Sequence, residues 1–162
     1  MNIFYVNDDP VLAAQDLCDK HIVKMILEGM QMMSTAHHVL RPSAEYLSEI
    51  LKPTHTNHPC NVWIRKSSDN YRWLHLHTVA LCHEYSNRYA KQHRLEDKFV
   101  YLDGNPSPIG SLTPPAQAMP IEFKVYNDPV QAYRNYYINS KSRFAEWRYS
   151  PTPAWYSQAI AA

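Results

Sequence analysis

The stretch Cys18–Met33, CDKHIVKMILEGMQMM, is the clearest helical segment of the chain and decides the fold class. Most of its positions are apolar, as expected of a buried helix. Four polar side chains, those of His21, Lys24, Glu28 and Gln31, stand at i, i+3, i+7 and i+10 and therefore share one face of an α-helix. The usual amphipathic ratio is inverted, because a narrow polar line crosses a wide apolar surface. This line is either the solvent face of a well-covered helix or the lining of a cleft.

The two interpretations predict different chemistry. Lys24 and Glu28 form an i, i+4 pair of the kind that helices place on their surface. A carboxylate that instead lines a cleft within an apolar surround suits general acid–base catalysis.

A second polar line lies further along the chain. Asn70, His77 and Glu84 stand at i, i+7 and i+14 of another helical segment, and Arg88 continues the line. Two such helices facing each other across one cleft would place His77 opposite Glu28. The alternative is an exposed ion pair between Glu84 and Arg88, with His77 satisfied in the core.

The remaining pattern predicts a mainly α fold, a single compact domain over residues 1–162 with about three long helices, short helices and a long Pro-rich loop. The long helical segments run over about 10–40 with a bend at 16–19, over about 61–94 with a break near 67–70, and onward from Asp128. Ser68 or Asp69 is expected to cap the helix after the break.

Four other segments have recognisable patterns. A short strand or an extended arm is predicted for residues 1–6, MNIFYV. A short amphipathic helix between prolines is predicted for residues 41–53, RPSAEYLSEILKP. The Pro- and Gly-rich stretch 103–120 is too long for a simple connector, which predicts a functional loop. The aromatic tail 147–162 is expected to pack back on the body.

Composition excludes several classes of function. The chain has 162 residues, 45% of them hydrophobic. Its formal net charge of +1 is a small positive excess for a protein that binds duplex nucleic acid, although it allows a local basic face. No apolar run reaches the roughly 18 residues of a membrane span, and no signal peptide is expected. Three cysteines without a CxxC pattern favour a reducing, cytoplasmic setting over a disulfide framework.

The chain also lacks the motifs of several chemistries. Only 3 glycines are present, and neither a Walker loop nor a dinucleotide fingerprint occurs. There is no HExxH, and His75 and His77 point apart at i, i+2, so no metal and no cofactor are expected. No GxSxG elbow occurs, and Cys82 among apolar neighbours reads as an inert thiol.

Three segments carry a resemblance to a known family. DKHIVKMILE (19–28) resembles the first-helix signature of the phage pyrimidine-dimer DNA glycosylases, also called endonuclease V, in which a catalytic Glu stands seven residues after a His. His21 and Glu28 have that spacing. The segment HPCNVWIRKSSDNYRWLHLHTVALCHEY and the ending PAWYSQAIAA are similar to two further patterns of the family, in the same order along about half the chain.

The resemblance implies a single α domain without metal or cofactor, acting on DNA. An N-terminal α-amine would attack C1′ of a damaged nucleotide and form a Schiff base, a Glu would stabilise the sugar cation, and β-elimination would cut the strand. Glu28 carries over as that Glu. Asn2 is bulkier than the residues that permit removal of the initiator Met, so the amine is expected on Met1. The family's arginines do not carry over, because this helix offers Lys24 but no Arg occurs before Arg41.

We therefore expect an enzyme that cleaves an N-glycosidic bond of a damaged or modified base in DNA, with Glu28, His21, His77 and Met1 as catalytic candidates. The substrate-binding candidates are polar side chains on the two lines, in the loops and on the third helix: Lys24, Gln31, His58, Asn70, Glu84, Arg88, Gln117, Arg134 and Lys141. A glycosidase or hydrolase of free nucleotides and a non-catalytic nucleotide-binding or inhibitor protein are the alternatives. Steep loss of affinity with salt would distinguish a DNA enzyme from a nucleotide enzyme.

Overall fold

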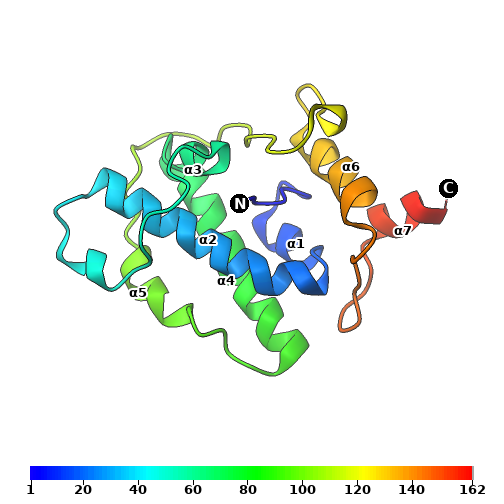
Figure 1. Cartoon of the computed structure of the whole chain (residues 1–162), viewed down its shortest axis with the longest axis horizontal. Coiled ribbons are helices and arrows are strands. Elements are labelled where there is room, and N and C mark those ends of the chain that lie inside the picture. The colour runs from blue at the N-terminus through cyan, green and yellow to red at the C-terminus, as the bar shows by residue number, and fades with distance from the viewer. Residues whose placement is uncertain (162) are drawn as a thin grey trace.

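The computed structural model describes residues 1–161, which form helices joined by loops (Figure 1). Within this range no residue is in a strand, and the mainly α fold class is confirmed. The α-helices are α1 (Pro10–Gln15), α2 (Asp19–Leu40), α3 (Pro59–Ile64), α4 (Ser68–Tyr89), α5 (Phe99–Leu102), α6 (Pro129–Lys141) and α7 (Ala154–Ala161), with short 3₁₀ turns at Glu45–Ser48, Glu96–Lys98 and Ile121–Phe123. None of the helices formed by residues 1–161 is long and apolar enough to cross a membrane.

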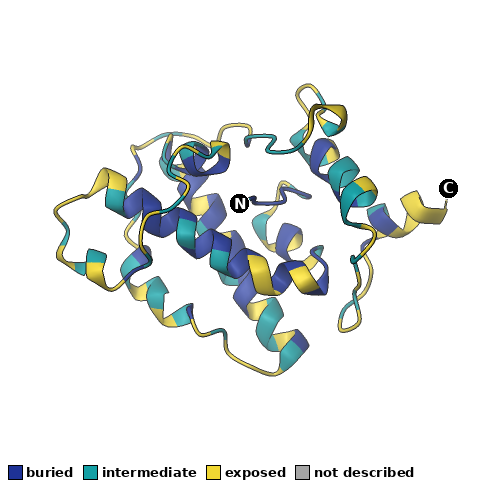
Figure 2. Cartoon of the chain, viewed as in Figure 1, coloured by how far each residue is buried: buried dark blue, intermediate teal, exposed yellow. Residues whose placement is uncertain are grey.

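The two longest helices, α2 and α4, pack against each other at the centre of the molecule (Figure 1). Most of α2 is buried along its length (Figure 2). The helices are in direct contact at Gly29, where an added Cβ atom would lie 2.4 Å from Thr78 Oγ1. This packing favours the second of the two interpretations of the α4 polar line, in which His77 is satisfied in the core.

Replacing Gly29 with Ala should lower the free energy of unfolding by about 1–3 kcal/mol, because overpacking displaces a helix contact. Thr78 cannot swing away cheaply, since its hydroxyl donates to Leu74 O at 2.8 Å. The clash should outweigh the gain of roughly 1 kcal/mol in helix propensity. Urea unfolding measures the change. Gly104→Ala is the control, because its new Cβ meets nothing nearer than Arg41 Nη1 at 3.5 Å; equal stabilities of the two variants would contradict the prediction.

Helix boundaries follow local capping. The Asp9 carboxylate accepts from Val11 N and Leu12 N at the start of α1, and the Asp128 carboxylate accepts from Gln131 N at the start of α6. At α4 the cap is Ser67, not Ser68 or Asp69, because Ser67 has extended backbone and its hydroxyl accepts from Asn70 N.

One expected element differs in the structure, and the choice between a strand and an arm at the N-terminus is decided. The segment 41–53 holds only a four-residue 3₁₀ turn at Glu45–Ser48 in place of the expected short amphipathic helix. Residues 1–6 form a buried arm without strand pairing, in which Phe4 has a φ of 46°. The arm reaches α6, where Arg134 Nε donates to Val6 O at 2.9 Å.

The aromatic tail packs back on the body, as expected. Trp155 Nε1 donates to Asp16 Oδ2 at 2.8 Å, and the ring of Tyr156 lies 4.7 Å from that of Trp147. Tyr133 and Tyr137 of α6 are fully buried and belong to the core. The tail and α6 therefore form one wall beside the N-terminal arm.

Candidate active site

Glu28 opens onto a cavity of about 320 Å³ between α2, the N-terminal arm and the end of α6. Only 8% of this residue is exposed, so the solvent-face interpretation of the first polar line does not hold for it. The cavity lining combines cations, aromatic rings and the arm itself: Met1, Asn2, Phe4, Lys20, His21, Lys24, Met25, Glu28, Tyr136, Lys141, Arg143 and Phe144.

The Glu28 carboxylate is held by three nitrogen atoms. Asn2 N donates to Oε2 at 2.7 Å, and the α-amine of Met1 lies 3.9 Å from the same oxygen. On the other side, Lys24 Nζ is 3.5 Å from Oε1. An amine and a carboxylate thus lie together at the base of the cavity, which is an arrangement suited to nucleophilic attack with local proton transfer.

The side chain of Asn2 fixes the arm that carries this amine. Its Oδ1 accepts from Ile3 N at 2.8 Å and from Phe4 N at 3.3 Å, and its Nδ2 donates to Ala118 O at 2.9 Å. Ala118 belongs to the Pro-rich stretch, which therefore helps to position residues 1 and 2.

His21 lines the cavity one helical turn from Lys24. Its ring stacks on Phe4 with centroids 4.3 Å apart, and its Nδ1 is 2.8 Å from the Tyr137 hydroxyl. Burial, followed by the charges of Lys141 and Lys24, lowers the pKa of His21 to about 3. The imidazole is thus neutral at physiological pH and supports the arm through stacking.

Acid should destabilise the protein through buried histidines. Burial lowers the pKa of His77 to about 4, as it lowers that of His21 to about 3. The unfolded chain binds these protons below about pH 6.5, so the free energy of unfolding should be flat above this pH. Below it, stability should fall by up to about 1.4 kcal/mol per pH unit for each histidine.

Urea titrations at pH 7, 6, 5 and 4 test this. His77→Phe removes one of these buried protonation sites, which also include His37, whose pKa burial lowers to about 4. It should therefore reduce the slope between pH 6 and 5, with His83→Phe, an exposed position, as the control. A slope unchanged in His77→Phe would contradict the assignment.

The rim of the cavity is basic and aromatic. Lys141 Nζ donates to the Tyr136 hydroxyl at 3.0 Å and lies 4.3 Å from the centre of that ring. Lys20 and Arg143 both lie over the ring of Phe144, at 5.4 and 5.8 Å. Such a rim suits a phosphate backbone with flat bases.

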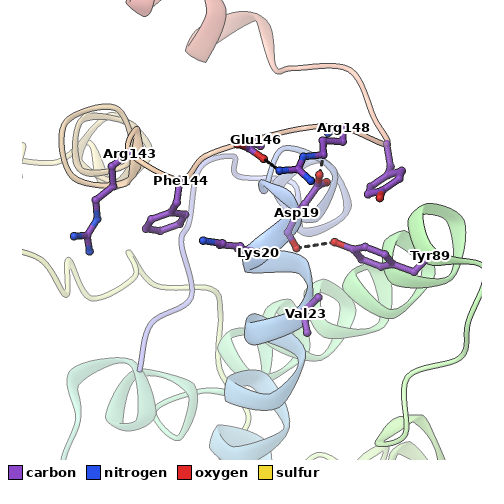
Figure 3. Close-up of a pocket in the computed structure, with 9 residues that line it drawn as sticks. Asp19, Lys20, Val23, Tyr89, Arg143, Phe144, Glu146 and Arg148 are labelled. Atoms are coloured by element: carbon purple, nitrogen blue, oxygen red, sulfur yellow. Dashed lines mark hydrogen bonds and ion pairs between the residues drawn. The ribbon is translucent and has the colours of Figure 1, made fainter.

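A second cavity, of about 550 Å³, adjoins the first along α2 (Figure 3). Lys20, Arg143 and Phe144 line both cavities. In Figure 3, Lys20 points from α2 toward Phe144, while Tyr89 closes the opposite side.

Arg88 and Glu84 lie away from the Glu28 cavity and form a buried ion-pair cluster. Arg88 Nε donates to Glu84 Oε2 at 3.0 Å, and Arg88 Nη1 donates to Asp19 Oδ1 at 3.1 Å. Further donors reach Leu17 O at 2.8 Å and Gln15 O at 2.9 Å. With its donors used internally and only 5% of the residue exposed, Arg88 is not placed to bind substrate.

His77 and Asn70 also serve the core. His77 Nδ1 is 2.9 Å from Pro10 O, and its ring stacks on Trp73 at 4.9 Å, so the structure does not bring it to Glu28. Asn70 Nδ2 donates to Thr113 Oγ1 at 2.8 Å, and its Oδ1 accepts from Thr113 N at 2.9 Å. Asn70 thereby fastens the Pro-rich stretch to α4.

Of the remaining candidates, two hold other segments in place and one lies outside the cavity. The Gln117 side-chain amide donates to Val125 O and accepts from Val125 N. Arg134 donates to Val6 O in the N-terminal arm, and its guanidinium lies over the ring of Trp155. Gln31 is half-buried on α2, outside the cavity lining.

His58 caps α3 by accepting from Cys60 N at 3.2 Å. Burial and then the nearby α-amine lower the pKa of His58, which places its ring close to the N-terminus. Burial raises the pKa of the Cys60 thiol to about 11, so this cysteine is protonated at physiological pH. Among residues 1–161 no group of three or more His, Cys, Asp or Glu is arranged to hold a metal ion.

The structure thus brings Met1, His21, Lys24, Glu28 and Lys141 together in one cavity. Sequence reasoning missed the other lining residues. Periodicity along one helix gives no information about the arm or the 141–144 turn, which meet α2 only in the folded chain. The grouping of two cations and one aromatic ring in KSRF (141–144) is the one sequence signal that could have found Arg143 and Phe144.

One comparison with known proteins gave a match. A family model described as pyrimidine dimer DNA glycosylase matches residues 1–97, more than half of the 162-residue chain. The match covers the arm, α2 with Glu28, and α4. No curated protein and no solved structure matches the chain.

Proposed function

Because the chain belongs to the pyrimidine dimer DNA glycosylase family, we propose that it cleaves the N-glycosidic bond of a damaged pyrimidine in DNA with Glu28 as the central catalytic carboxylate. The observation that carries the proposal is the placement of Met1 N and Asn2 N at 3.9 and 2.7 Å from Glu28 Oε2, inside a basic and aromatic cavity.

In the proposed reaction the neutral α-amine of Met1 attacks C1′ of the damaged nucleotide. The bond from C1′ to the base breaks, and the base leaves with the bonding electron pair and takes up a proton. The Glu28 carboxylate stabilises the positive charge that develops at C1′ and then accepts the proton that the amine loses. When the sugar ring opens, Glu28 passes this proton to O4′, which leaves a Schiff base between C1′ and the amine and restores the carboxylate.

Strand cleavage follows from that intermediate. A base removes a proton from C2′, and the electron pair moves to expel the 3′ phosphate by β-elimination. The Glu28 carboxylate is the candidate base, since it lies beside the amine that carries the sugar. Water then hydrolyses the imine and restores the amine.

The choice of DNA as the substrate is supported by four cations, those of Lys20, Lys24, Lys141 and Arg143. These four cations surround the cavity although the formal net charge of the chain is only +1, so the basic groups are concentrated where the substrate would lie. Phosphate contacts of this kind make binding fall steeply with salt. A free nucleotide would use fewer of these cations.

Borohydride trapping tests the proposal. The protein is incubated with ultraviolet-irradiated DNA, undamaged DNA and a panel of free nucleotides in the presence of borohydride, and the N-terminal peptide is examined by mass spectrometry. An adduct on Met1 that forms only with irradiated DNA is the expected result. Base release with no adduct would remove the amine from the mechanism, and absence of both would overturn the glycosylase assignment.

A further inference from the structure

The second cavity is larger than the Glu28 cavity and shares part of its lining. Its volume is about 550 Å³, against about 320 Å³ for the first, and the two share Lys20, Arg143 and Phe144. In a strand that has one nucleotide at Glu28, the next nucleotide would lie either in this second cavity, which forms a groove, or in solvent.

The groove offers the chemistry of a nucleotide site. Phe144 and Tyr149 present aromatic surfaces, with Tyr149 58% exposed, and Val23 adds an apolar contact. Lys20 and Arg143 bring positive charge beside the Phe144 ring. Bases stack on such rings irrespective of sequence, and cations of this kind take the phosphate.

The carboxylates in the groove already have partners within the protein. Asp19 pairs with Arg88 at 3.1 Å and also accepts from Arg148 N at 2.9 Å. Glu146 pairs with the Arg148 guanidinium. Lys20 and Arg143 thus remain as cations that could face an anionic ligand.

The wall of the groove is fastened to α2. Asp19 N donates to Glu146 O at 2.9 Å, and the Asp19 carboxylate holds Arg148 N from the other side. The Tyr89 hydroxyl donates to Asp19 O at 3.1 Å (Figure 3). The Tyr89 and Tyr149 rings pack edge to face with centroids 5.5 Å apart. The site is therefore preformed, which lowers the entropic cost of binding.

We propose that this second cavity binds the nucleotide adjoining the attacked one on the same DNA strand, with its phosphate at Lys20 and Arg143 and its base on Phe144 and Tyr149. The inference rests on the proposed function for the identity of the strand. It assigns a role to the 143–149 segment, which lies outside the matched residues 1–97.

Oligonucleotide trimming tests the inference. Single-stranded oligonucleotides with a central abasic site, which presents the sugar carbon without a base, are shortened one nucleotide at a time from either end. Affinity is measured by fluorescence anisotropy, and borohydride adducts are measured in parallel. Removal of the adjoining nucleotide on one side should weaken binding to the wild-type protein by about tenfold, the value of one stacked base.

Tyr149→Ala should nearly abolish the difference between the longer and the trimmed oligonucleotide. Tyr126→Ala is the matched control, because Tyr126 is 92% exposed and lines neither cavity; it should keep the tenfold difference. Two results would overturn the inference. One is a wild-type affinity that does not change when either end is trimmed, and the other is a tenfold difference between the longer and the trimmed oligonucleotide that persists in Tyr149→Ala. Loss of adducts with all oligonucleotides would instead refute the amine mechanism and leave the binding result to be judged by itself.

Discussion

Glu28→Gln should lower kcat on DNA containing pyrimidine dimers by about 10²–10⁴-fold, the range lost when a positioned acid–base group is removed. The substitution keeps an oxygen that can accept from Asn2 N, so the arm should stay in place. The amide cannot take the proton from the attacking amine and carries no charge to stabilise the sugar cation. Steady-state cleavage of a dimer-containing duplex measures the loss, and urea unfolding checks that the fold is retained.

Glu122→Gln is the matched control, since Glu122 is exposed on the Ile121–Phe123 turn and lines neither cavity. It should cleave at the wild-type rate. Turnover that survives in Glu28→Gln would contradict the mechanism. A wild-type protein that binds damaged DNA without any turnover would favour the binding-protein alternative.

Arg88→Met should cost about 3–5 kcal/mol of unfolding free energy, the penalty of breaking a buried ion pair from one side. The change leaves the Glu84 and Asp19 carboxylates without their buried cation. It also removes the donors to Leu17 O and Gln15 O, which join the end of α1 to the start of α2. Thermal and urea unfolding measure the effect.

Two variants make this prediction specific. Arg94→Met alters an exposed arginine beyond the end of α4 and should change stability by less than about 0.5 kcal/mol. Arg88→Lys keeps the charge but cannot supply the several fixed donors of a guanidinium, so it should recover only part of the loss. Full stability in Arg88→Lys would show that charge alone, without the donor geometry, holds this junction.

The helices could be predicted from the sequence because their signals are local. Apolar spacing along α2 and α4, Asp9 before Pro10 and Asp128 before Pro129 each act within a few residues. Short segments such as 41–53 were less predictable, since a 3₁₀ turn and a short α-helix have nearly the same residue pattern.

The site was predictable only where it lies on one helix. His21, Lys24 and Glu28 follow from periodicity and the family resemblance, whereas Asn2 and Phe144 reach the cavity through long-range packing. The second polar line also lies along one face of a helix, but in a different environment. Sequence spacing places the residues of a line on one face of a helix, but it does not tell what that face contacts. Arg88 contacts backbone carbonyls there, and solvent or substrate would have given the same spacing.

The buried start of the chain has a practical consequence for handling the protein. The Met1 side chain is only 2% exposed, and its amine faces Glu28. A purification tag joined ahead of Met1 would convert that amine into an amide, which is not nucleophilic, and would force extra residues through the cavity. The end of α7 is exposed at Ile160 and Ala161, so a tag belongs there. Preparations tagged at the two ends should therefore differ in activity as sharply as an active enzyme and its knockout.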